Sequence, residues 1–112
     1  MGLLKNVQDV AYGKNKTYAN DNLAAGADTL DPYTDMGNRP VAKGFIAVGG
    51  NSKTGSVSVV LTFGDGETGD AIVIDEDESF PLDGLNVKSI AISFISAAAR
   101  YRVVCFPRES WS

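Results

Sequence analysis

The chain has 112 residues, a length that favours one domain with a hydrophobic core of its own. Its composition, 44% hydrophobic and 21% charged, is that of an ordinary globular protein. The net charge of −4 argues against a nucleic-acid partner, because nucleic-acid binders usually carry a basic surface. One cysteine and no histidine exclude an internal disulfide and remove the most frequent general base and metal ligand. No apolar run reaches the roughly 18 residues that span a bilayer, so we expect no membrane span.

Residues 1–40 differ from the rest of the sequence in their polarity. Residues 5–22 are mostly polar, with isolated apolar side chains at Val7, Val10, Tyr12 and Tyr18. We interpret this segment as an extended N-terminal arm or irregular chain, with one or two edge strands as the alternative. Residues 23–27 fit either a short helical turn or a strand. The prolines of Asp31-Pro32 and of residues 37–40 exclude a central strand there, because proline lacks the amide donor.

Residues 55–63 show the clearest strand pattern. Apolar side chains occupy every second position of this stretch: Val57, Val59, Leu61 and Phe63. Side chains alternate between the two faces of a strand, so these four predict a half-buried strand with one core face. A glycine-rich loop at residues 64–70 and a strand at 71–74 complete a predicted hairpin.

Three further strands are expected, at residues 45–48, 87–95 and 100–106. Pro107 ends the last of them. The strands recur every 10 to 15 residues with turn signals between them, and no stretch has a sustained helical period. The sequence therefore predicts an all-β fold: a single antiparallel β-sandwich or jelly-roll-like domain with an extended polar N-terminal arm. The predicted division is residues 1–40 as arm and irregular or edge segment, 41–107 as sandwich core, and 108–112 as C-terminal tail.

No motif in the sequence predicts catalysis or a bound cofactor or metal. Gly64, Gly66 and Gly69 match the spacing of a dinucleotide fingerprint, but that fingerprint must open a helix, and a strand follows here. Acidic residues cluster around the same hairpin, in an irregular spacing that lacks the calcium-loop pattern: Asp65, Glu67, Asp70, Asp75, Glu76, Asp77 and Glu78. We interpret them as a solvated edge, with a cation or a basic partner surface as the alternative. We expect Cys105 to be buried and to act as a small hydrophobic residue. We also expect that the protein is not an enzyme.

The candidate interface residues lie outside the core strands. Aromatic residues and arginine are the usual anchors of protein interfaces. The residues of this kind are Tyr12, Tyr18, Tyr33, Arg108 and Trp111. Local packing over the open ends of the sandwich is the alternative for the same side chains.

Several stretches together resemble small β-sandwich capsid accessory proteins of phages and viruses, such as decoration, cement or penton-type subunits. The stretches are residues 23–28 (Leu-Ala-Ala-Gly-Ala-Asp), 34–37 (Thr-Asp-Met-Gly), 41–50, 55–57 and 101–104 (Tyr-Arg-Val-Val). This resemblance implies a structural subunit of a virion or similar assembly. It further implies assembly in the host cytoplasm, other capsid or assembly proteins as partners, and a homo-oligomer.

Two function classes stay open at this point. The first is the structural subunit of an assembly, acting through protein–protein contacts. The second is a small recognition module that binds carbohydrate or protein through its loops. The loops at residues 49–55 and 64–70 contain no aromatic side chain, which favours the first class.

Overall fold

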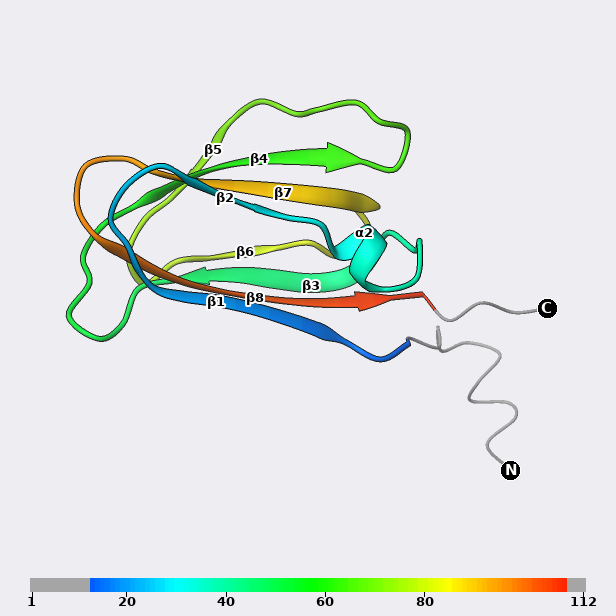
Figure 1. Ribbon diagram of the computed structural model, residues 1–112, viewed down its shortest axis with the longest axis horizontal. Helices are drawn as coiled ribbons and strands as arrows, with labels where there is room; N and C mark the ends of the chain where they lie inside the picture. Colours follow the sequence, from blue (N-terminus) through cyan, green and yellow to red (C-terminus); the bar gives the residue numbers. More distant parts are fainter. Residues whose placement is uncertain (1–12, 109–112) are drawn as a thin grey trace.

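The computed structural model describes residues 13–108, which form an all-β domain with one short helix. Figure 1 shows its strands in two layers, with both ends of the described chain at the same end of the domain. The elements in chain order are β1 (Lys16–Leu23), β2 (Ala27–Leu30), α2 (Pro32–Asp35), β3 (Val41–Val48), β4 (Val57–Phe63), β5 (Ile72–Ile74), β6 (Ser79–Pro81), β7 (Val87–Phe94) and β8 (Ala99–Pro107).

The eight strands form one open antiparallel sheet that folds into two halves. Its path is β1-β8-β3-β7-β4-β5, with β2 added at β7 and β6 added at β3. The pairing between β3 and β7 consists of Val41 opposite Val87. Because this junction is so narrow, β1-β8-β3-β6 forms the lower layer of Figure 1 and β2-β7-β4-β5 forms the upper layer.

The pairing of the strands is nested along the chain. β1 pairs with β8, β2 with β7, β3 with β6, and β4 with β5, all antiparallel. Eight strands arranged in two facing sheets in this way are typical of a jelly roll. The predicted all-β, sandwich-like fold is therefore confirmed.

The alternation predicted for the strands positions the hydrophobic core between the two layers. Val57, Val59 and Leu61 of β4 are buried, as are Ile90 and Ile92 of the neighbouring β7. In β8 the buried residues are Tyr101, Val103 and Cys105, while Arg102 is exposed. Each side chain therefore lies on the face that its position in the pattern predicted, and the apolar faces of the two layers pack against each other.

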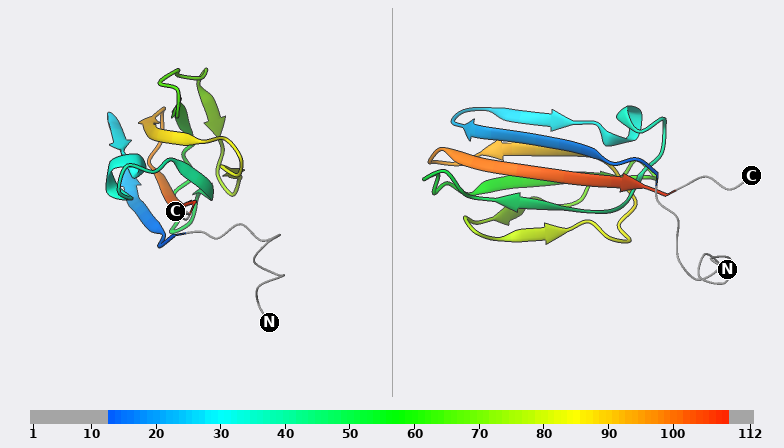
Figure 2. Two further views of the ribbon diagram at one scale, coloured as in Figure 1. Left: turned by 90° about the vertical axis from the view of Figure 1, so that its right-hand side faces the viewer. Right: turned by 90° about the horizontal axis from the view of Figure 1, so that it is seen from below.

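The segment before residue 41 contains more regular structure than an arm. β1 pairs with β8 over most of its length, and the right-hand view of Figure 2 shows the two strands side by side. Leu23 at the end of β1 belongs to the hydrophobic core together with Met36. For the described part of residues 5–22, the edge-strand alternative is therefore the one that the structure shows. Lys16–Leu23 is therefore an edge strand and not an arm, and Tyr18, which looked isolated in sequence, lies opposite Val103 of β8. The core accordingly takes in two residues that precede the range 41–107.

The short helix α2 was not among the predicted elements. The Asp31 side chain accepts a hydrogen bond from the Thr34 amide, and Pro32 occupies the first turn. An acidic N-cap followed by proline is a common start for a helix, because proline at the first helical position removes an amide that has no partner there. The same Asp31-Pro32 pair that indicated a chain break thus starts a helix of four residues.

Candidate functional site

Tyr18 is partly buried and makes its contacts within the described chain on the β1 side of the sandwich. It lies on β1 and packs against the core, and its hydroxyl donates a hydrogen bond to Asp35 Oδ2 at 2.5 Å. Burial, and then the bond and the charge of Asp35, raise the pKa of the Tyr18 hydroxyl well above its usual value. The bond therefore ties the end of α2 to β1, across the side of the sandwich.

Of the other four candidate interface residues, Tyr33 and Arg108 are described. The Tyr33 ring lies under Lys88 Nζ, which is 4.7 Å from the ring centroid, in cation–π contact. Arg108 is exposed, directly after β8. Tyr12 and Trp111 lie outside the described residues. The structure thus does not gather the described candidates into one site, because Tyr18, Tyr33 and Arg108 have separate surroundings.

A polar network on the same side of the sandwich was not predicted. Asp28 Oδ2 on β2 accepts hydrogen bonds from the Tyr101 hydroxyl at 2.7 Å and from Asn20 Nδ2 at 2.8 Å. These two donors lie on β8 and β1, in the opposite layer. Burial and the bond to Asp28 raise the pKa of Tyr101. The carboxylate consequently joins the two layers where their edges meet, which no local sequence signal could reveal.

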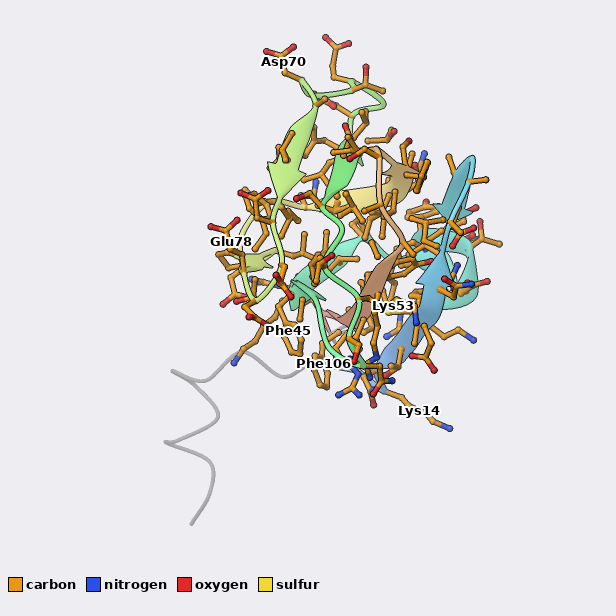
Figure 3. All side chains as sticks on the ribbon, turned by 90° about the vertical axis from the view of Figure 1, so that its left-hand side faces the viewer. Lys14, Phe45, Lys53, Asp70, Glu78 and Phe106 are labelled. Carbon is orange, nitrogen blue, oxygen red and sulfur yellow. The ribbon has the colours of Figure 1, made fainter. Side chains whose placement is uncertain are left out.

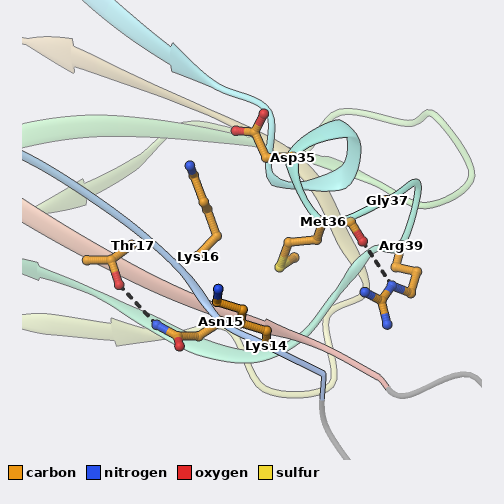
Figure 4. A pocket seen from close by; sticks show the side chains of 8 residues that line it. All are labelled: Lys14, Asn15, Lys16, Thr17, Asp35, Met36, Gly37 and Arg39. Carbon is orange, nitrogen blue, oxygen red and sulfur yellow. Dashed lines mark hydrogen bonds between the residues drawn. The ribbon is translucent and has the colours of Figure 1, made fainter.

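An open pocket of about 540 Å³ lies at the end of the domain where the described chain begins and ends. Figure 4 shows it between β1 and the turn after α2, with Lys14 and Lys16 on one wall and Arg39 on the other. Arg39 Nε donates to the Met36 carbonyl oxygen at 2.9 Å, which fixes the side chain against the turn. The lining thus combines three cations with one carboxylate, Asp35, and favours an anionic group over a neutral one.

The acidic residues of the hairpin form one edge of the sandwich. They lie in the loops on either side of the short strand β5 and are exposed, and we call Asp65, Glu67, Asp70, Asp75, Glu76, Asp77 and Glu78 the acidic edge. The carboxylate of Asp75 accepts a hydrogen bond from Ser56 Oγ, and that of Glu78 accepts one from the Asp75 amide. The backbones of Asp77 and Glu78 are bonded to Val48 of β3. Within residues 13–108 no group of three acidic, cysteine or histidine side chains is arranged to hold a metal ion.

The glycines of residues 64–69 and Cys105, which the sequence also singled out, have roles in the fold. The glycines of residues 64–69 lie in the loop between the antiparallel strands β4 and β5, and Gly66 has a φ of 90° that suits glycine there. Cys105 is fully buried in β8, and its burial raises the thiol pKa to about 12. Because the thiolate is the reactive form, this burial disfavours thiol chemistry at Cys105. No helix of the described chain is long and apolar enough to cross a membrane.

Comparisons with known proteins find solved structures of similar fold, but no matching sequence family. No protein-family model and no curated protein matches the chain. A solved structure titled "Bacillus endospore appendages form a novel family of disulfide-linked pili" is 20% identical. It covers 93% of this chain and 92% of its own, with a TM-score of 0.59. At this identity the match shows a shared fold alone.

Two weaker matches have lower TM-scores. The SPBc2 prophage-derived protein YomS is 9% identical, covers 88% of this chain and 99% of its own, and has a TM-score of 0.49. The Yersinia pseudotuberculosis-derived mitogen is 8% identical, covers 93% and 91%, and has a TM-score of 0.46.

Proposed function

We propose that the protein is a structural subunit of a virion or similar assembly, of the decoration, cement or penton type. It acts through protein–protein contacts with other capsid or assembly proteins and with copies of itself. The observation that carries the proposal is the position of the chain ends. The Gly13 amide donates to the Pro107 carbonyl oxygen at 2.8 Å, so the described chain begins and ends side by side, at one end of the domain.

Several features of the described chain support a structural role. The tyrosine hydroxyls of Tyr18 and Tyr101 are engaged in bonds that hold the two layers and α2 together. The only cysteine of this sequence is buried. These are the surroundings of groups that stabilise a fold, and we propose no catalytic step for the protein.

The fold match to an appendage subunit is compatible with this proposal but adds no mechanism. Its title describes disulfide-linked pili, and such linkage needs an accessible thiol. Cys105 is fully buried in this chain, so Cys105 does not provide a covalent link between copies. We propose that contacts in the assembly are non-covalent and that the protein is found in the assembled particle.

The test is incorporation into particles. Native protein should co-sediment with large particles, and a chain lacking residues 1–12 should fold but be incorporated less. Trp111→Ala should have the same effect, because buried aromatic side chains offset the entropy lost when a segment is ordered on binding. Thermal melting of each variant provides the control for folding. Absence of the native protein from every particle fraction would overturn the proposal.

A small recognition module is the second candidate, and the basic pocket is the observation that favours it. Its volume of about 540 Å³ lies within the usual range for ligand sites. Calorimetric titration with acidic and neutral glycans distinguishes the two functions. A stable monomer whose binding of an acidic glycan is lost in Lys16→Ala would favour the module over the structural subunit.

A further inference from the structure

The outer surface of the lower layer has an apolar centre with positive charges around it. Because Ile46, Val103 and Cys105 point into the core, the alternate side chains of β3 and β8 face outward. We call this outward-facing set the basic face: Lys43, Phe45, Ala47, Arg102, Val104, Phe106 and Arg108.

The register of the strands brings the apolar members of the basic face together. Phe45 lies opposite Val104 on β8 and Pro81 on β6, and Phe106 lies opposite Lys43. Phe45 is 40% exposed although it is a large aromatic residue in the middle of a sheet. Exposed aromatic side chains with a charged surround are typical of the centre of a protein interface.

The acidic edge has the opposite charge and its own exposed apolar residue. Residues 54–87 contain eight carboxylates and no lysine or arginine. Val73, in the strand between the two acidic loops, is 57% exposed. Of the three large hydrophobic residues that the described chain exposes, Phe45 belongs to the basic face and Val73 to the acidic edge, and the third is Ile95.

The two surfaces of one molecule point in different directions. In Figure 3, Asp70 lies at the top, away from Phe45 and Phe106 toward the bottom, whereas Glu78 lies at the side, nearer to Phe45. Charges of opposite sign on two different surfaces allow one molecule to contact the next through them. A contact between different surfaces of identical subunits repeats, and it produces a ring when the rotation closes or a filament when it does not.

We propose that the basic face binds the acidic edge of a second copy of this chain. Phe45 contacts the apolar part of that edge around Val73, while Arg102 and Arg108 lie near its carboxylates. This inference rests on the proposed function, since it specifies one contact through which copies assemble. It differs from the contacts proposed for residues 1–12 and Trp111, so the two can fail separately.

Charge reversal followed by mixing tests the proposal on the full chain. One variant carries Arg102→Glu and Arg108→Glu, and the other carries Asp70→Lys and Glu76→Lys. All four side chains are exposed, so the fold should tolerate the changes. Analytical ultracentrifugation at low salt should show self-association of the unmodified chain, weakened roughly tenfold in each variant. An equimolar mixture of the two variants should associate like the unmodified chain, because each reversed surface then meets its complement.

Salt and the apolar centre supply two further measurements. Self-association should weaken strongly between about 0.01 M and 1 M salt, since the Debye length falls from roughly 30 Å to 3 Å. Phe45→Ala should weaken association, whereas Ile95→Ala, which removes a side chain of similar exposure elsewhere, should not.

Three outcomes overturn the inference: a chain that stays monomeric at low salt, variants that associate as well as the unmodified chain, or a mixture that fails to recover. In each of these cases the proposed function survives if the protein still co-sediments with particles.

Discussion

The two lateral sides of the sandwich use the same acidic residue types for different purposes. On the β1–β2 side, Asp28 and Asp35 accept hydrogen bonds from Tyr101 and Tyr18, and they join elements that are far apart in sequence. On the β5–β6 side, the carboxylates of the acidic edge accept hydrogen bonds from residues of the same hairpin or from Ser56. The comparison indicates that carboxylates of the β1–β2 side connect distant elements, whereas those of the acidic edge stay exposed.

Removal of the β1 side should have the largest effect. Deleting residues 1–22 removes nearly all of β1 and exposes the edge of β8. We expect the loss of cooperative unfolding, since the loss of a paired strand exceeds the roughly 0.5–3 kcal/mol of most single substitutions. Deleting residues 1–12 leaves β1 in place and is the matched control. Thermal melts of both chains measure the effect, and equal melting temperatures would show that β1 does not contribute to the core.

Substitutions in the centre of the sandwich provide a reference for the effects of substitutions on its two sides. Leu61→Ala on β4 and Ile92→Ala on β7 should each reduce the free energy of unfolding by roughly 2–5 kcal/mol, because both side chains are buried. Denaturant titrations provide the values. Losses below about 0.5 kcal/mol in both variants would mean that the interior is not packed as described.

The next prediction compares the loss of unfolding free energy for one acidic residue from each side. Asp28→Ala should destabilise the protein by roughly 1–3 kcal/mol, because the Tyr101 hydroxyl loses its acceptor and its residue is only 2% exposed. Glu67→Ala, in the acidic edge, should change the free energy of unfolding by less than about 0.5 kcal/mol. Chemical denaturation of the two variants in parallel measures the difference. Similar values for both would remove the distinction between the sides.

A smaller effect concerns alkaline pH. The raised pKa values of Tyr18 and Tyr101 mean that the fold favours their neutral hydroxyls. This contribution is complete below the unfolded tyrosine pKa of about 10 and is lost as the pH rises above it. Stability should therefore fall between about pH 10 and 11, and it should fall less steeply in Tyr101→Phe. Melting temperatures across this range, with Tyr33→Phe as control, measure the slope. Parallel slopes for Tyr101→Phe and the unmodified chain would contradict the prediction.

The sequence predicted the elements whose signal is local. The alternation from Val57 to Leu61 predicted both the strand and its buried face. The glycines after Phe63 predicted the hairpin loop. The first residues of β3 were missed because Gly44 weakens a strand pattern. In the structure, a Cβ at this glycine would lie 2.1 Å from the Val104 carbonyl oxygen, so the close approach of β8 explains it. The strand β6 was not among the predicted strands. It contains Pro81, which is tolerated there because β6 pairs with β3 alone.

The parts of the candidate sites that the sequence did not reveal depend on contacts between distant residues. Asp28 and Tyr101 are 73 positions apart, and no spacing rule connects them. The basic pocket likewise combines β1 with the turn after α2. The exposure of Phe45 was not accessible from the sequence either. Phe45 to Val48 are all apolar, so alternation alone does not tell which face of the strand is buried.

The nested pairing of the strands has a consequence for how the chain reaches its folded state. Only β4 and β5 are neighbours along the chain among the four nested pairs, so this hairpin closes the shortest loop. The pairs β3–β6, β2–β7 and β1–β8 each enclose the pair before them. Long-range pairings of this kind make folding slow, because the entropy of loop closure is lost before the contacts form. During synthesis, β1 leaves the ribosome first and must wait for β8, the last strand to be made, before it has a partner.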